Sequence, residues 1–257
     1  MKALFFLAGF LVVSSLGLFG QADSIGSMKQ PDTTKPAKNF KNVIRYNISG
    51  PILFGFDYVV LGYERMVGKY QSFSINGGQA RFPKIINIIT DSFSVNKDTK
   101  NTGYNLSVDY RFYLKKENKY MAPHGVYIGP YFSFNRFERD VTWDFKKGSV
   151  VEQISTDTRF TINSFGVELG YQFAWKRFTL DFLMVGPGIA SYNLKTTIDG
   201  NINASEKEEL LDALKQLISQ RFPGMNFVFS DHEINSDGVL DTWAVGYRFI
   251  IHVGFRF

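Results

Sequence analysis

The sequence contains no cysteine, which excludes a disulfide framework and also the acylated cysteine that anchors a bacterial lipoprotein. Beyond the N-terminus it has no run of about 18 or more apolar residues, and this argues against a transmembrane helix. Lysine and arginine give a net charge of +5 but form only short pairs, so the basic stripe of a nucleic-acid-binding protein is missing. Only three histidines are available for acid–base catalysis or metal binding. Aromatic residues are abundant: they make up 16% of the 257 residues, with 26 phenylalanines and 13 tyrosines.

The first 22 residues have the pattern of a secretory signal peptide. Lys2 provides the positive charge, residues 3–13 are apolar, and Gly20-Gln21-Ala22 is a small-x-small cleavage site. A short buried helix is the alternative interpretation. Residues 23–40 are polar, contain two prolines and show no periodicity, which predicts a flexible leader. We therefore expect an exported protein whose folded part is residues 41–257.

From residue 41 onward the sequence alternates between apolar and polar residues, as strands do. In residues 104–114, for example, Tyr104 and Leu106 share one face while Asn105 and Ser107 share the other. Eight strands are predicted, at residues 42–49, 56–65, 71–82, 104–114, 125–137, 163–173, 178–186 and 242–257. The links 83–103, 138–159 and 187–241 are long and most of the others are short, an alternation typical of outer-membrane barrels. The first link, around Gly50-Pro51, is short and breaks this alternation.

The size of the apolar residues predicts which face of the barrel is outside. In the last strand one face carries large side chains from Trp243 to Phe257, and the other carries small or polar residues such as Gly246 and Arg248. An eight-stranded barrel has an interior only just wide enough for side chains, so the large apolar face must point outward. The fold class predicted is therefore all-β: an eight-stranded antiparallel transmembrane β-barrel with one helix in the last long loop. A soluble, lipocalin-like barrel is the alternative.

Several stretches resemble a known class of proteins: LGYER (61–65), DYRFYL (109–114), GVYIGPYF (125–132), GVELGYQF (166–173) and the last strand. Their order and spacing are similar to those of small outer-membrane β-barrels of the OmpA/OmpX type, and to a family of such barrels common in Bacteroidota. The resemblance implies a bacterial outer-membrane location but no established activity. It also implies that the barrel assembly machinery reads the end of the last strand as a signal, namely Phe249, Ile251, Val253, Phe255 and Phe257.

The faces predicted to point inward carry charges of both signs. Unpaired charges are costly in a closed interior, so we expect salt bridges among them. The predicted polar network consists of Glu64, Asp109, Arg111, Glu168, Asp181 and Arg248, with Arg256 as a further candidate. A proton or solute path through these residues is the alternative.

The last long loop, residues 187–241, contains the helix predicted at 205–222. Ser205 and Glu208 have the spacing of a capping box, and Pro223-Gly224 would end the helix. Its apolar stripe has helical periodicity and comprises Leu210, Leu211, Leu214, Leu217 and Ile218. The stripe could pack on the barrel mouth or adjacent loop strands, insert into the membrane surface, or bind a protein partner. As candidate site residues, these five residues are assigned to the binding of a partner.

Two short polar motifs in the same loop contain residue types that can take part in catalysis or metal binding. SDHE (230–233) places His232 beside Ser230, Asp231 and Glu233, although a polar loop tip has the same composition. Residues 233–241 (EINSDGVLD) resemble the start of a calcium loop, but Ala244 occupies the position of the bidentate acid. We therefore predict no catalytic residues, no metal site and no cofactor.

The sequence thus favours a non-enzymatic, porin-like outer-membrane barrel that serves as a structural or interaction protein of the cell envelope. Its expected partners are outer-membrane lipid, the barrel assembly machinery during insertion and an envelope protein bound through the extracellular loops, with no role for nucleic acid. The alternative is an enzyme that modifies outer-leaflet lipid or a narrow solute conduit.

Overall fold

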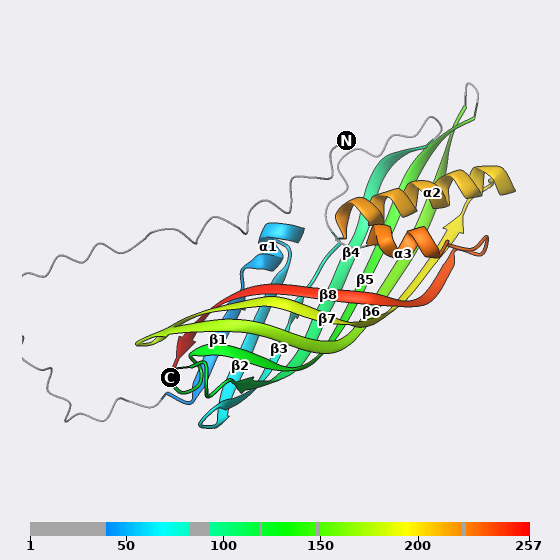
Figure 1. Cartoon of the computed structure of the whole chain (residues 1–257). Coiled ribbons are helices and arrows are strands. Elements are labelled where there is room, and N and C mark those ends of the chain that lie inside the picture. Colours follow the sequence, from blue (N-terminus) through cyan, green and yellow to red (C-terminus); the bar gives the residue numbers. More distant parts are fainter. Residues whose placement is uncertain (1–39, 83–92, 119, 148–149, 223–224) are drawn as a thin grey trace, which may run out of the picture. The chain divides into compact units, whose positions relative to one another are not determined.

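Eight antiparallel strands form a closed ring (Figure 1). The computed structural model describes residues 40–82, 93–118, 120–147, 150–222 and 225–257. The predicted signal peptide, and the predicted leader apart from Phe40, lie outside these residues. The strands are β1 (Asn42–Asn47), β2 (Val59–Gly68), β3 (Gln71–Gln79), β4 (Phe93–Tyr113), β5 (Gly125–Lys147), β6 (Val150–Trp175), β7 (Phe178–Asp199) and β8 (Val239–Arg256). The helices are α1 (Ser49–Phe54), α2 (Ala204–Arg221) and α3 (Met225–Asp231).

Each strand pairs with its neighbours in sequence, and β1 closes the ring against β8. The closing register runs from Val43 opposite Arg256 to Asn47 opposite His252. The prediction of eight antiparallel strands arranged in a ring is therefore confirmed.

The strands β4 to β7 are much longer than predicted. Residues 93–103 and 138–147 belong to strands, where the sequence had suggested loops, and the predicted loop 187–241 shortens to 200–238. We call the part of β4 to β7 that contains these added segments the extension (residues 93–103, 136–147, 150–163 and 190–199); it continues beyond the ends of β1, β2 and β3 (Figure 1).

The apolar side of these strands changes face where the extension begins. On β5, Ile128 and Phe132 point outward and are exposed, whereas Phe137, Val141 and Trp143 point inward and are buried. On β6, Phe165 and Val167 point outward, whereas Ile154 and Phe160 point inward. The predicted strands stop at the boundary of the extension because this change of face interrupts the alternation by which each strand was recognised.

On the side of this change that lies away from the extension, which we call below, an apolar belt surrounds the ring. Every strand contributes to it, and representative outward and exposed members are Ile44, Leu61, Ile75, Leu106, Phe132, Val167, Ile189 and Phe249. Exposed fractions such as 46% for Leu106 and 49% for Val167 are those of a surface rather than of a protein core. The prediction that the large side chains of the last strand point outward agrees with the exposure of Trp243, Tyr247 and Phe255.

The short first strand is continued by α1, a helix that the sequence did not predict. Past Asn47, the N–H of Ile48 still donates to the carbonyl of Ile251 at 2.9 Å. The hydroxyl of Ser49 then accepts a hydrogen bond from the N–H of Ile251 at 3.2 Å. A side chain therefore satisfies the edge of β8 where backbone pairing with β1 ends.

The helix predicted at 205–222 is present as α2, but its cap lies two residues earlier than expected. The side chain of Asn203 accepts from the N–H of Glu206, and the Glu206 carboxylate accepts from the N–H of Asn203. Ser205 and Glu208 therefore do not form the capping box. The two pairs have the same spacing, and asparagine is as good an N-cap as serine. The segment also contains α3, so the expectation of a single helix there was wrong.

Candidate functional site

Two buried arginines lie at the centre of the ring interior. Arg45 on β1 contacts Asp109 at 3.1 Å and Asp181 at 3.5 Å. Arg111 on β4 contacts Asp109 at 2.7 Å and Asp181 at 2.9 Å. Glu64 lies 3.8 Å from Arg45 and 3.7 Å from Arg111, and all five side chains are at most 1% exposed. The two arginines therefore share carboxylates from three different strands.

A second set of contacts extends this network along the axis. Arg248 on β8 contacts Glu168 at 3.2 Å, and Glu168 is also 3.4 Å from Arg111. The guanidinium of Arg248 lies 5.0 Å from the centre of the Tyr131 ring, and it donates to the hydroxyl of Ser107 at 3.1 Å. Cation–π contact and hydrogen bonding both stabilise a buried guanidinium.

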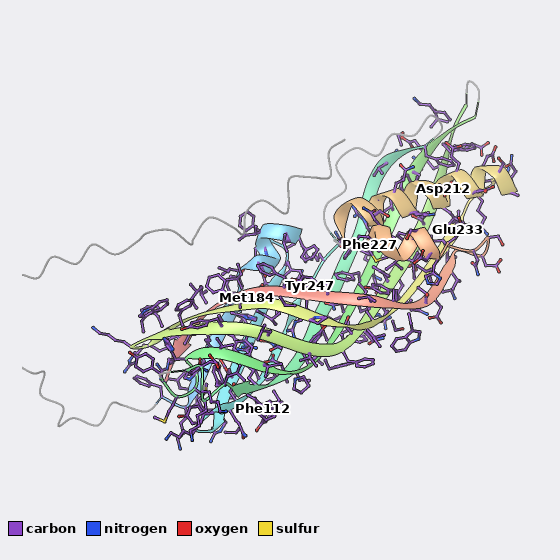
Figure 2. The ribbon with its side chains drawn as sticks, viewed as in Figure 1. Phe112, Met184, Asp212, Phe227, Glu233 and Tyr247 are labelled. Carbon is purple, nitrogen blue, oxygen red and sulfur yellow. The ribbon has the colours of Figure 1, made fainter. Side chains whose placement is uncertain are left out.

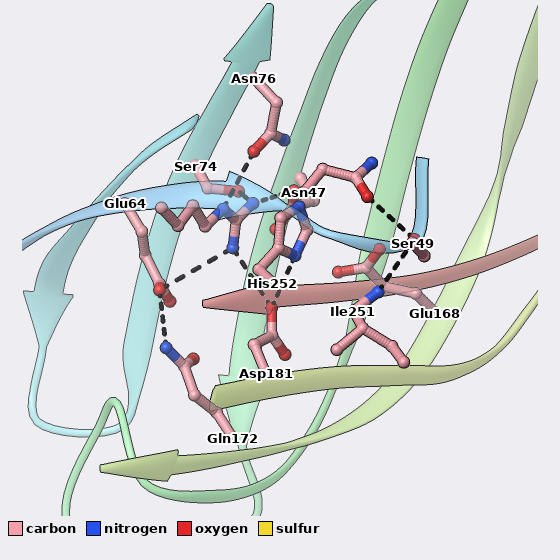
Figure 3. A network of polar contacts seen from close by, with 12 residues as sticks. Asn47, Ser49, Glu64, Ser74, Asn76, Glu168, Gln172, Asp181, Ile251 and His252 are labelled. Carbon is pink, nitrogen blue, oxygen red and sulfur yellow. Dashed lines mark hydrogen bonds and ion pairs between the residues drawn. The ribbon is translucent and has the colours of Figure 1, made fainter. Parts of the chain in front are cut away.

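Neutral side chains add hydrogen bonds to Asp181 and Glu64. The hydroxyl of Tyr127 donates to Asp181 at 2.7 Å, and the amide of Gln172 donates to Glu64 at 3.1 Å. The ring of His252 lies 3.2 Å from Asp181. Figure 3 shows Glu64, Gln172, Asp181 and His252 converging from separate strands. Buried charges with partners and hydrogen bonds are tolerated, whereas lone ones are not.

Glycines make room for the largest of these side chains. A Cβ atom at Gly62 would lie 2.9 Å from Cγ of Arg45 and would also collide with Asn76. A Cβ atom at Gly170 would collide with the ring of Tyr127. The inward faces of β2 and β6 therefore carry glycine next to the large side chains of the network. Any other residue would occupy the space that these side chains fill.

The structure brings all six predicted network residues together, which were Glu64, Asp109, Arg111, Glu168, Asp181 and Arg248. Arg256 does not join them: it donates to the carbonyl of Lys176 at 3.3 Å. The sequence interpretation placed His252 on the inward face but left both His252 and Arg45 out of the predicted network. Both residues stand between outward apolar neighbours. The alternation that identified the other inward charges could therefore have included them in the network.

Above the charged network, apolar side chains fill the interior of the extension. One cluster gathers Phe82, Phe137, Phe160 and Phe222 with residues of α3, and it also includes Tyr58 and Val60 near the top of β2. A second cluster packs Phe93, Trp143 and Phe145 against the first half of α2. Together with α2 and α3, these two clusters form what we call the apolar cap.

The apolar cap buries the stripe that we had assigned to a protein partner. Leu210 is 0% exposed, and the other members, Leu211, Leu214, Leu217 and Ile218, are at most 6% exposed. The protein's own strands cover them, so the assignment of these five residues to a partner-binding surface was wrong. The stripe belongs to the core because the extension, which the sequence did not predict, provides an apolar surface for it.

The two polar motifs of the last loop make contacts with residues close to them in sequence. Ser230 donates to the carbonyl of Phe227 at 2.8 Å and lies 3.4 Å from Asp231, while His232 is exposed. The side chain of Asn235 accepts from the N–H groups of Asp237 and Val239, so it stabilises a turn. Within the described part of the chain, no group of three or more His, Cys, Asp or Glu residues is placed to hold a metal ion.

The residues expected to form the assembly signal lie on β8 and at its end. Phe249, Val253, Phe255 and Phe257 are exposed on the outer face, and Ile251 is partly buried there. In the described residues, no helix has the length and apolar character needed to cross a membrane.

These features define a class: an eight-stranded antiparallel ring whose interior is filled by an ion network and an apolar cap. Comparisons with protein-family models and with curated protein sequences find no match to this chain.

Proposed function

We propose that this protein is an outer-membrane β-barrel of the OmpA/OmpX type without an enzymatic role. In this proposal the extension and the apolar cap together form a rigid extracellular platform that the barrel anchors. The change of the apolar face at the base of the extension carries the proposal. Below that level large apolar residues face outward and charges face inward, as a lipid environment requires. Above it the order reverses, as water requires.

The length of the apolar belt supports a membrane location. Its outward residues run from Tyr104 to Phe112 on β4 and from Phe165 to Trp175 on β6. Both stretches match the roughly 9–11 residues of a tilted transmembrane strand. Aromatic residues such as Tyr104, Trp175 and Trp243 lie at the two ends of the belt, where interfacial side chains concentrate.

The filled interior favours an anchor over a conduit. A solute would have to displace paired charges around Arg111 and then the apolar cap around Phe160. Such a path is costly because the network loses its partners when it opens. The platform would meet an envelope protein through its exposed surface, which includes Asp212, Phe227 and Glu233 (Figure 2). Phe227 is 81% exposed, an unusual position for a large aromatic side chain.

Membrane insertion is tested by expressing the full chain in a Gram-negative host and separating the membranes on a density gradient. The wild type should sediment with the outer membrane and show heat-dependent mobility in SDS gels. Val167→Arg places a charge in the belt and should lower the folded amount severely, since such a charge costs about 2–4 kcal/mol near the bilayer centre. Thr197→Arg, on the outer face of the extension, is the matched control and should insert normally. A wild-type protein that is soluble without detergent would overturn the membrane assignment.

The interaction role is tested by placing a photo-crosslinking amino acid at position 212, 227 or 233, and at Phe112 in the belt as a control. Crosslinks to one protein from the first three positions and not from the fourth would support the platform. Ion conductance of the purified protein in planar bilayers would instead favour the conduit.

A further inference from the structure

A compact set of charges lies on the outer face of β4, β5 and β6, just above the apolar belt. Three cations surround the carboxylate of Glu138: Arg136 at 2.7 Å, Arg159 at 3.2 Å and Lys100 at 3.3 Å. We call these four residues the Glu138 cluster. The three cations remain accessible, with side-chain exposures of 34%, 50% and 48% respectively, so this is a surface site rather than part of the core.

The cluster adjoins the last aromatic residues of the belt. Arg136 follows Phe134 on the outer face of β5 and is opposite Tyr104 in the β4–β5 register. The rings of Tyr104 and Phe134 are 5.6 Å apart. With a rise of about 3.3 Å per residue and a tilt of about 40°, Arg136 and Glu138 lie roughly 5–10 Å above Phe134. This is the level of the lipid headgroups when the belt lies in hydrocarbon.

The charge of the cluster is not balanced. Three cations face one carboxylate, and Lys195 lies opposite Arg159 in the β6–β7 register. The nearest outward aspartates on these strands, Asp140 and Asp157, lie opposite each other, level with Lys100 and farther from the belt than Arg136 and Arg159. On the side that faces the membrane, positive charge is therefore in excess, which attracts anionic lipid.

The bonds made to Glu138 are those that a phosphate group would accept. Nε and Nη2 of Arg136 both donate to one carboxylate oxygen, at 3.0 and 2.7 Å. Arginine binds carboxylates and phosphates through the same fork of donors. Hydrogen bonds from Arg136 and Lys100 lower the pKa of Glu138 to about 2, which reflects how strongly the surrounding cations favour an anion.

We propose that the Glu138 cluster binds the phosphate of an outer-leaflet lipid headgroup, with Glu138 competing for the same cations. This inference rests on the proposed outer-membrane location. The bound lipid would hold the extension at a fixed height above the bilayer, because the ligating residues come from three of its four strands.

The test uses the full-length protein purified in detergent and titrated with bisphosphorylated lipid A, with the same lipid after removal of its phosphates, and with inorganic phosphate alone. The wild type should bind the phosphorylated lipid at least about tenfold more tightly than the dephosphorylated one, and a Lys100→Gln/Arg136→Gln/Arg159→Gln variant should lose this difference. Lys69→Gln/Lys115→Gln/Lys116→Gln removes the same charge at turns on the other side of the belt and should bind like the wild type. Heat-dependent gel mobility reports that each variant is folded.

Glu138→Gln separates a binding site from a structural ion cluster. If Glu138 competes with phosphate, the variant should bind phosphorylated lipid more tightly than the wild type. Weaker binding by Glu138→Gln, or equal binding of the two lipids by the wild type, would overturn the inference. If inorganic phosphate binds as tightly as the lipid, the claim that the bound phosphate belongs to a lipid headgroup would be overturned. Sedimentation of the wild type with the outer membrane, measured separately, keeps a failure of this site distinct from a failure of the proposed function.

Discussion

Replacing Arg111 with methionine should destabilise the protein by about 3–5 kcal/mol, because removal of one partner leaves buried charges uncompensated. Arg111 is 0% exposed and lies 2.7 Å from Asp109, 2.9 Å from Asp181 and 3.4 Å from Glu168. Methionine preserves an unbranched apolar side chain, so the change mainly removes the charge and its hydrogen bonds. Arg45, Arg111 and Arg248 face four carboxylates in the native network, and the variant leaves two arginines for the same four.

The measurement is urea-induced unfolding of protein reconstituted in lipid vesicles, followed by tryptophan fluorescence. Trp175 and Trp243 lie on the outer face of the ring, so on the proposed membrane location their fluorescence should report its release from lipid. Arg65→Met provides the matched control. Arg65 is exposed on the outer face and donates to Asn42 at 3.3 Å, so its loss should cost less than about 1 kcal/mol.

A second substitution tests whether the loss comes from uncompensated charge. Asp109→Asn in the Arg111→Met background removes one of the carboxylates that lost Arg111 as a partner, so that Arg45 and Arg248 face three carboxylates. The double variant should be more stable than the sum of the single effects predicts, by a coupling of about 0.5–3 kcal/mol. Equal losses for Arg111→Met and Arg65→Met, or strict additivity in the double variant, would refute the reasoning.

Three further predictions follow from other parts of the structure. Leu214→Ala should destabilise the apolar cap by about 2–5 kcal/mol and make residues 200–238 accessible to trypsin. Asp212→Ala, on the exposed side of α2, should leave the rate of cleavage unchanged. Equal protection of the two variants from trypsin would count against the cap. Ser49→Ala removes the acceptor for the N–H of Ile251 and should cost about 1 kcal/mol in urea unfolding, with faster hydrogen exchange at Ile251. The pKa of Glu138 is lowered from its ordinary 4.5 to about 2, so its contribution to stability is present above pH 4.5 and is lost as the pH falls toward 2. Hydrogen exchange in residues 136–159 should therefore be unchanged from pH 7 to 5 after correction for intrinsic rates, and Glu138→Gln should abolish the change seen at lower pH.

The inward charges could be predicted because strand alternation is local. Asp109 and Arg111 stand between Val108, Tyr110 and Phe112, so their face follows from their neighbours. The partners of buried charges on other strands could not be predicted in the same way. Asp181 is far from Arg45 in sequence, and the two meet only because the ring is closed.

The role of α2 was decided by strands that the sequence did not predict. The periodicity of Leu210, Leu214 and Leu217 showed that one face of the helix must be covered. Only the packing of Phe93, Trp143 and Phe145 shows what covers the first half of that face. A change of the apolar side from even to odd residues, visible between Phe134 and Phe137, is the signal by which the extension could have been found.

The sequence by itself determined the number of strands, the face that holds the large apolar residues in the predicted part of each strand, and the presence of an amphipathic helix. These properties follow from periods of two and 3.6 residues and need no knowledge of distant neighbours. Only the tertiary structure decided the length of the strands, the partners of the buried charges and the covering of the helix. Each of these depends on residues far apart in the chain that meet when the ring closes, where the interior must pair its charges and bury its apolar side chains together.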